Sequence, residues 1–221
     1  MILTDEQIAV NKETFLEFVN SIEREGMDKE LLIKQLNGSD FFYAPASTKY
    51  HSDFAGGLCL HSINVYIALK KICQAMYTVY KDDNTIEDLC PYDDNTLKIV
   101  ALFHDFDKMN KYERTVINKK VYSDAGTKYD EMGKFDWVSV PGYKYKEYKD
   151  IFVMGTHGEN SAYMTGRFIP LTTEEHCAIV NHHSIYDNPK LDVSMIFRRY
   201  PLACLLHLAD MACTYVVEID E

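Results

Sequence analysis

The chain has 221 residues, of which 47% are hydrophobic and 26% are charged. This length and balance predict a single globular domain, residues 1–221, with a substantial core. The formal net charge of -11 argues against a surface that grips long duplex nucleic acid, because phosphate backbones are bound by basic surfaces, but it is compatible with small, metal-chelated phosphate substrates.

The first 57 residues predict two helices and a loop. Residues 4–7, Thr-Asp-Glu-Gln, have the form of a capping box and begin the first helix, which apolar residues from Ile8 to Ile22 continue at helical spacing. A second helix is expected to open at Asp28 and to stop at Asn37-Gly38. These helices lie within an N-terminal section, residues 1–50. Residues 39–57 contain Pro45 and paired glycines and predict a loop.

The next two predicted helices carry polar residues in apolar surroundings. Residues 58–80 form a helical pattern that places His61 on the apolar face. After a polar connection over residues 81–95, a helix that starts at Thr96 places His104 on its apolar stripe, with Asp105 and Lys108 beside it. An imidazole next to a carboxylate in such a setting needs a hydrogen-bonded partner or a metal ion.

Residues 113–150 interrupt the helical pattern and predict an irregular or β insertion. Residues 135–140 alternate as a short strand does, and Pro141-Gly142 predicts a turn. A solvated flap over the core and a lid that contacts substrate are both compatible with this segment.

The C-terminal part returns to helices. Thr172 opens one by a capping-box pattern, with His182 on the same face as Ile179, and Pro201 begins the last one. Asp210 occupies a position in that last helix where a leucine is expected. Because all but one of the candidate ligands lie on predicted helices, we expect a mainly α fold, a helical bundle with a small β-hairpin insertion or flap.

Cysteine usage and hydropathy favour a cytoplasmic protein. The six cysteines show no CxxC spacing and most have apolar neighbours, which is typical of reduced core thiols rather than a zinc knuckle or a disulfide framework. No basic segment followed by an apolar core opens the chain, and no uncharged run approaches membrane-spanning length. No membrane partner is therefore expected.

The polar residues of these helices occur in a recognisable order. His61, His104-Asp105 and Asp210 resemble the H, HD, D signature of the HD-domain metal-dependent phosphohydrolases. Residues 56–62 look like the GGLxxHS entry to the first ligand, residues 101–108 like the LLHDxxK core, and residues 205–210 like the closing LxxADxxA helix. The resemblance covers residues 55–215 and implies an HD-domain helical bundle in which these four side chains bind a divalent metal ion.

Two further segments resemble the two-metal branches of this family, which include cyclic-dinucleotide phosphodiesterases and some 3′-5′ exonucleases. Residues 155–161 and 179–183 stand where those branches carry extra histidines. The resemblance implies that His157 and His182 bind a second ion and that Asp105 bridges both ions. It implies one or two ions of a divalent transition metal, Mn, Fe, Co, Ni or Zn. Because no Gly-Tyr-Pro follows His182-His183, the cyclic-di-GMP branch is not supported.

Other polar residues near the HD pair, and the remaining histidines, also have expected roles. The family's nucleotidases often use a glutamate shortly after the HD pair, and Asp107 or Glu113 would have to serve here. Lys108 and His183 are expected to neutralise charge on phosphate oxygens, and Glu159 is a candidate for substrate binding. Three other histidines are expected to be structural or exposed, namely His51, His176 and His207, although His207 lies close enough to Asp210 to orient it.

We therefore expect a metal-dependent phosphohydrolase that hydrolyses a nucleotide or a related phosphate ester through a metal-activated water, which Asp105 positions or deprotonates. One alternative is a phosphodiesterase, either a 3′-5′ exonuclease or an enzyme that cleaves a cyclic or oligonucleotide messenger. Another is a catalytically silent module that binds a nucleotide or a metal as a sensor. The expected partner is a small phosphorylated molecule, and a homo-oligomer is compatible with the sequence.

Overall fold

The computed structural model describes residues 2–49, 51–80, 86–183 and 192–218. Within these residues the fold is mainly helical, with two small antiparallel sheets. The α-helices are α1 (Asp5–Ser21), α2 (Lys29–Asn37), α3 (Gly57–Tyr77), α4 (Asp94–Phe103), α5 (His157–Gly166), α6 (Thr173–Val180), α7 (Val193–Arg199) and α8 (Pro201–Ala212). The strands are β1 (Thr78–Tyr80), β2 (Ile86–Asp88), β3 (Tyr112–Tyr122), β4 (Lys128–Asp130) and β5 (Gly133–Tyr145). Single turns of tighter or wider helix are η1 (Phe106–Lys108), η2 (Tyr148–Asp150) and η4 (Cys213–Val217).

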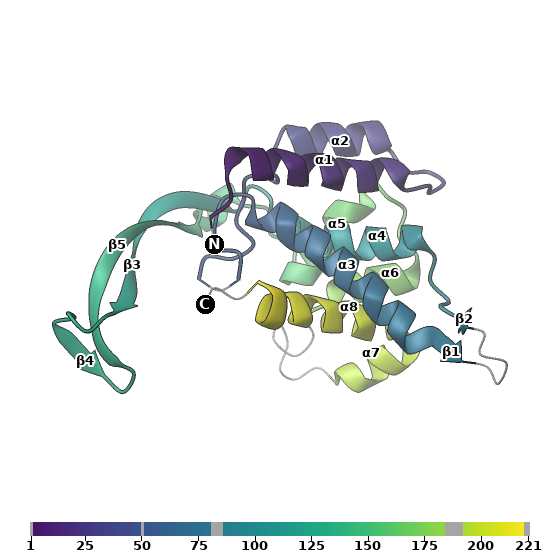
Figure 1. The fold of residues 1–221 in the computed structure, drawn as a ribbon. Helices are drawn as coiled ribbons and strands as arrows, with labels where there is room; N and C mark the ends of the chain where they lie inside the picture. Colours follow the sequence, from purple (N-terminus) through teal and green to yellow (C-terminus); the bar gives the residue numbers. More distant parts are fainter. Residues whose placement is uncertain (1, 50, 81–85, 184–191, 219–221) are drawn as a thin grey trace.

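The helices surround a long central one. Helix α3 packs against α4 on one side and α8 on the other, and α6 packs against both α5 and α8. Figure 1 shows α1 and α2 lying together along one side of this bundle, with α7 and α8 on the opposite side. The predicted mainly α class is therefore confirmed.

Local signals account for the helix starts. Thr4 and Thr172 form the predicted capping boxes, and Asp28 accepts a hydrogen bond from the backbone of the second helix. Thr156 adds a capping box at the start of α5 that the sequence analysis did not identify. Each such cap contributes about 1 kcal/mol to the stability of its helix.

Buried aromatic rings hold the segment around His104 in place. Phe103 and Phe106 are fully buried, with ring centroids 5.3 Å apart. Phe103 lies against Phe15 of α1 with centroids 5.9 Å apart, and Phe106 lies against Phe41 with centroids 6.0 Å apart. His104 and Asp105 therefore lie between two anchored side chains, which limits how far their own side chains can move.

Two ion pairs tie distant segments together. Arg24, after α1, binds Glu175 of α6 through two hydrogen bonds of 2.6 and 2.9 Å. Asp94, at the start of α4, accepts hydrogen bonds from Lys70 and Tyr66 of α3 and pairs with Lys98 one turn along its own helix. The first pair is largely buried, because the side chain of Glu175 is 1% exposed.

The insertion is a long β-arm. Strands β3 and β5 pair without interruption from Tyr112↔Tyr145 to Tyr122↔Phe135, and β4 adds a short strand at the tip. Figure 1 shows this arm curving away from the helices. The predicted turn at Pro141-Gly142 is wrong: both residues lie inside β5, opposite Val116 and Thr115. A proline is tolerated here because β4 pairs only with residues 133–135 and needs no N–H from Pro141. A glycine is required at position 142 because a Cβ there would lie 2.5 Å from the side chain of Ile117.

Two other segments differ from the expectation. The helix predicted over residues 58–80 ends at Tyr77, and β1 and β2 form a hairpin where a polar connection was expected, although residues 81–85 lie outside the described residues. Helix α7 was not predicted, although Val193, Ile196 and Phe197 have helical spacing; all its residues are at least partly exposed, and Ile196 and Phe197 pack against the core. No single described helix is long and apolar enough to cross a membrane, and only the bent pair of residues 193–199 and 201–217, which meet at 113°, passes a test of length and composition.

Candidate metal centre

The candidate ligands lie mostly at helix ends rather than on helix faces. His61 and Asp210 are inside α3 and α8, as predicted. Helix α4 stops at Phe103, however, so that His104 caps it and Asp105 leads into the single turn η1. His157 is the first residue of α5, and His182 follows the end of α6. Because the backbone changes direction at these ends, side chains from five segments can point to one place.

The first group of side chains is His61, His104 and Asp210, all buried. His61 Nε2 lies 3.1 Å from Asp210 Oδ1 and 3.3 Å from His104 Nε2. Ligand atoms that share one transition-metal ion at about 2.1 Å are separated by about 3.0–3.4 Å in octahedral or tetrahedral geometry. The third distance, from His104 Nε2 to Asp210 Oδ1, is longer at 3.9 Å. Two of the three distances thus match those of ligands to a single ion, and the group is close enough to hold one.

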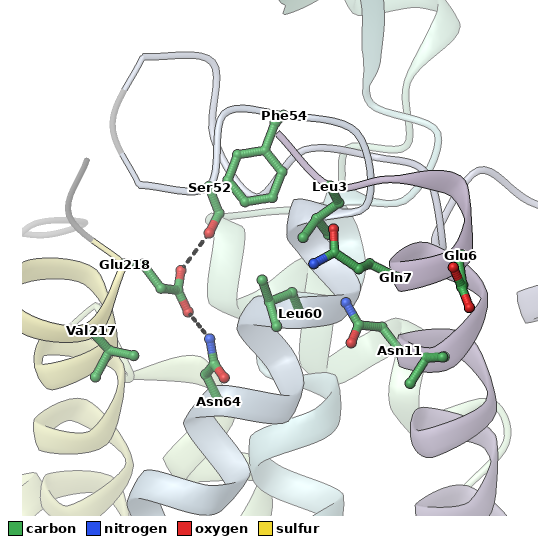
Figure 2. A pocket seen from close by; sticks show the side chains of 11 residues that line it. Leu3, Glu6, Gln7, Asn11, Ser52, Phe54, Leu60, Asn64, Val217 and Glu218 are labelled. Atoms are coloured by element: carbon green, nitrogen blue, oxygen red, sulfur yellow. Dashed lines mark hydrogen bonds between the residues drawn. The ribbon is translucent and has the colours of Figure 1, made fainter. Parts of the chain in front are cut away.

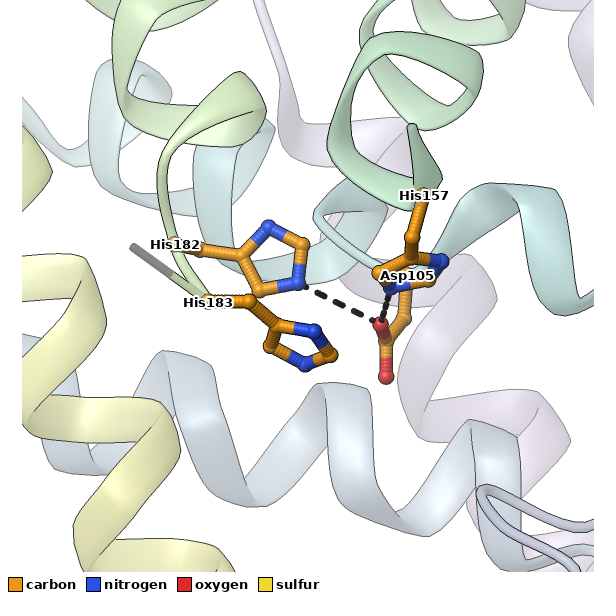
Figure 3. A group of neighbouring side chains, drawn as sticks. All are labelled: Asp105, His157, His182 and His183. Carbon is orange, nitrogen blue, oxygen red and sulfur yellow. Dashed lines mark hydrogen bonds and ion pairs between the residues drawn. The ribbon is translucent and has the colours of Figure 1, made fainter. Parts of the chain in front are cut away.

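Asp105 lies between this group and a second one. Its Oδ2 is 3.6 Å from His61 Nε2 and 3.5 Å from His104 Nε2. Its Oδ1 is 2.5 Å from His157 Nε2 and 3.5 Å from His182 Nε2. Figure 3 shows this second group, in which His183 accompanies His157 and His182 around the Asp105 carboxylate. One carboxylate therefore faces two clusters of imidazoles.

Hydrogen bonds fix which nitrogen of each ring faces the centre. His104 Nδ1 lies 2.7 Å from the carbonyl oxygen of Ala101, and His182 Nδ1 lies 2.6 Å from that of Ile179. A carbonyl only accepts, so each Nδ1 donates its proton and each Nε2 carries a lone pair that points inward.

The donor set fits a metal ion. His182 Nε2 is buried without a hydrogen-bond partner among the described residues. Inward lone pairs with buried carboxylates beside them repel one another unless a cation or a proton lies between them. The chain thus has buried His and Asp groups that can hold a metal ion, and the donors suit imidazole- and carboxylate-binding transition metals.

Two lysines and Asp107 surround the second group. Lys108 Nζ is 2.6 Å from Asp105 Oδ2 and is buried, contrary to what its charge alone suggests. Asp107 forms ion pairs with His157 Nδ1 and with Lys111, so this carboxylate orients His157. Glu113, the other residue considered for such a role, pairs with Lys144 on the arm instead.

Glu218 also belongs to the centre, although no sequence pattern singled it out. Both of its oxygens face His61 Nδ1, at 3.1 and 3.2 Å. Ser52 Oγ donates to one oxygen at 2.7 Å and Asn64 Nδ2 donates to the other at 2.9 Å. Figure 2 shows these bonds at the wall of a cavity of about 580 Å³ between α1, α3 and the end of the described chain. Glu218 thus holds His61 so that its Nε2 faces the other ligands.

The electrostatics follow from this arrangement. Burial alone would lower the pKa of His61, but the carboxylates of Glu218 and Asp210 outweigh burial and raise it to about 10. Burial lowers the pKa of His104 to about 3, which keeps that ring neutral. Burial opposes ionisation of Glu218, yet His61 and its hydrogen bonds lower its pKa to about 2. The carboxyls of Asp105 and Asp210 are also ionised, because positive neighbours and histidines lower their pKa against the effect of burial.

A cavity of about 410 Å³ opens on the centre. Its wall includes Asp210, His182 and His183 from the two groups, and also His51, Met211 and Tyr215. His183 Nε2 lies 3.8 Å from Asp210 Oδ2, so His183 stands beside both groups. Glu159 is not brought to the centre: it is exposed, and its carboxylate accepts a hydrogen bond from the backbone of Thr156.

The three remaining histidines have different surroundings. His176 is exposed on α6, as expected. His207 Nδ1 lies 2.6 Å from the carbonyl oxygen of His182, so its contact is with the turn that carries His182 rather than with Asp210. His51 packs against His61 with ring centroids 4.7 Å apart, in the immediate surroundings of the centre. The expectation that His51 is merely structural or exposed overlooked this position.

Comparison of the chain with family models, with curated proteins and with solved structures found no match in any of the three.

Proposed function

We propose that the protein is a metal-dependent phosphohydrolase of the HD-domain type, acting on a nucleotide or a related small phosphate ester. The observation that carries the proposal is the position of Asp105, whose two oxygens face two groups of buried histidines while Lys108 binds the same carboxylate. This is the order of ligands that the sequence motifs imply, and side chains far apart in the sequence provide it.

The ligand roles follow the two groups. His61, His104, Asp105 and Asp210 hold one divalent ion, and Asp105 with His157 and His182 holds a second. Such ions polarise phosphoryl oxygens and can lower the pKa of a bound water to about 7. Glu218 and Asp107 orient His61 and His157 from behind, which is the usual role of a carboxylate hydrogen-bonded to a metal-binding imidazole.

Other side chains act on the substrate. Lys108 keeps a positive charge at the Asp105 carboxylate, where it can neutralise charge that develops on a phosphate oxygen. His183 is partly exposed and lines the cavity, so its ring can donate a hydrogen bond to a phosphate that enters from solvent. Asp105 accepts the proton of the attacking water or positions that water.

The cavity supports a small substrate. Its volume of about 410 Å³ is within the range of small-molecule sites. Tyr215 and Met211 give one part of its wall an aromatic and apolar character that suits a base or another flat group.

Metal analysis and a substrate panel test the proposal. Elemental analysis of the purified protein should give one or two divalent ions per chain. With manganese, the protein should release phosphate from one of a set of nucleoside mono- and triphosphates. Cleavage of cyclic nucleotides or short oligomers instead would make it a phosphodiesterase, and binding without turnover would make it a sensor module.

A pair of variants tests whether metal binding and activity depend on the centre or only on the acidic charge of the protein. Asp210→Asn should lose bound metal and activity together, because it removes a buried ligand charge. Asp5→Asn, on the exposed first turn of α1, makes the same chemical change away from the centre and should have no effect. Full activity and metal content in Asp210→Asn would contradict the proposal.

A further inference from the structure

His51 differs from the other imidazoles around the centre. Its two ring nitrogens are both buried, and neither has a hydrogen-bond partner among the described residues. By contrast, His61, His104 and His182 each have Nδ1 bound to a carboxylate or to a backbone carbonyl. A buried imidazole without partners loses its hydrogen bonds to water and gains none in return, so a native site that keeps one usually has a bound molecule to contact it.

The backbone holds His51 firmly in this position. Ser47 Oγ donates to the carbonyl oxygen of His51 at 2.9 Å, and the backbone N–H of Ala46 donates to the carbonyl oxygen of Ser52 at 3.0 Å. Ser52 in turn binds Glu218, which holds His61. The loop that carries His51 is thereby joined to the same carboxylate that orients the first candidate metal ligand.

His51 lies at the wall of the cavity, and one of its ring nitrogens is also within 4.8 Å of ligand atoms of His61 and Glu218. It packs on the ring of His61 and lines the cavity of about 410 Å³ together with His183 and Asp210. A molecule that fills this cavity touches Asp210, and therefore the candidate metal centre, while it lies against His51. An imidazole has an N–H donor in either tautomer, and an oxyanion of the bound molecule is the matching acceptor.

We propose that His51 is a substrate-binding residue that donates a hydrogen bond to a phosphate oxygen of the molecule held in this cavity. The inference rests on the proposed function and adds to it a contact from the loop before α3. Because both ring nitrogens are buried, the His51 side chain has to turn toward the cavity to make this contact, while the hydrogen bonds of the loop keep its backbone in place.

Phosphate binding to the manganese-loaded protein tests the proposal. Inorganic phosphate is the probe, and the broadening of its phosphorus NMR signal by bound manganese gives the dissociation constant. His51→Ala should keep its manganese and bind phosphate about 10- to 100-fold more weakly, the loss expected for one hydrogen bond to a charged group. His51→Gln retains an N–H donor, so its phosphate affinity should lie between those of His51→Ala and the unaltered protein. His176→Ala, exposed on α6, is the matched control and should bind as the unaltered protein does.

The other outcomes overturn the proposal in distinguishable ways. Unchanged phosphate affinity in His51→Ala, with manganese retained, means that His51 contacts only water, and the proposed function is unaffected. Loss of manganese in His51→Ala and His51→Gln means that His51 supports the metal ligands instead. If the unaltered manganese-loaded protein does not bind phosphate, both the proposed function and the role of His51 are wrong. Should His51→Ala fail to fold, the comparison of His51→Gln with the unaltered protein decides.

Discussion

Replacement of Glu218 by glutamine probes how the candidate metal centre is held in shape. The change keeps the size of the side chain but removes its charge. Both carboxylate oxygens accept hydrogen bonds, from His61 together with Ser52 and Asn64. With its NH₂ group toward Asn64, the new amide faces a donor and loses that hydrogen bond. With its NH₂ group toward Ser52, whose hydroxyl can accept, the amide keeps its hydrogen bonds, but in both orientations His61 loses its charged partner.

The expected loss of metal affinity follows from the role of the Glu218 carboxylate in orienting His61. Removal of a carboxylate that orients a metal-binding imidazole typically lowers metal affinity by 10- to 100-fold, or about 1.4–2.7 kcal/mol. Glu218 accepts from three side chains and its side chain is 4% exposed, so water cannot easily replace it. We therefore expect the upper half of this range, about 30- to 100-fold, for Glu218→Gln.

Chelator competition measures the effect. The protein is titrated with Zn²⁺ or Mn²⁺ against an indicator of known affinity, with Glu6→Gln as the control. Glu6 lines the same cavity as Glu218 but is exposed and contacts no candidate ligand. Thermal unfolding of the metal-free variants shows whether both remain folded. If folded Glu218→Gln binds metal as tightly as Glu6→Gln, His61 does not need this carboxylate, and the interpretation of the site is wrong.

Three further predictions concern the centre and the fold. Asp105→Ala should lose metal binding and turnover together, and normal activity would contradict the proposed function. Arg24→Met leaves the buried Glu175 carboxylate without its partner and should lower the free energy of unfolding by about 3 kcal/mol in urea, with metal content unchanged. Burial opposes ionisation of Asp94, but its lysine partners lower its pKa, so the stability it contributes is present above pH 3.8 and lost as the pH falls further. Asp94→Asn should therefore flatten the decline of melting temperature in acid, and an unchanged decline would contradict this.

The sequence predicted those parts of the fold that local signals determine. Capping boxes and apolar spacing located the starts of α1 and α6, and the polar residues singled out on apolar faces, His61 and Asp210, are buried. The arm was only partly predicted. Residues 135–140 showed a strand pattern, whereas β3 is exposed on both faces along most of its length and has no alternation to reveal it.

Glu218 and His51 could not have been found by such signals. Glu218 follows a π-helical turn, in which the backbone hydrogen bond shifts by one residue and helical spacing no longer tells where a side chain points. His51 lies in a loop, where no periodicity exists. Their contacts join residues that are distant in the sequence, such as Ser52 and Glu218, and only the packed fold brings these together.

The charged side chains around the candidate metal centre come close to balance without an ion. Opposed pairs of side chains balance one another: four carboxylates, Asp105, Asp107, Asp210 and Glu218, face four cationic groups, His61, His157, Lys108 and Lys111. Burial alone would lower the pKa of His157, yet Asp107 and Asp105 raise it to about 9, and that of His61 is about 10. Both rings therefore carry protons at neutral pH that stand in for metal charge. If the centre binds a divalent ion as proposed, the ion has to displace these protons, so binding should release protons and strengthen as the pH rises.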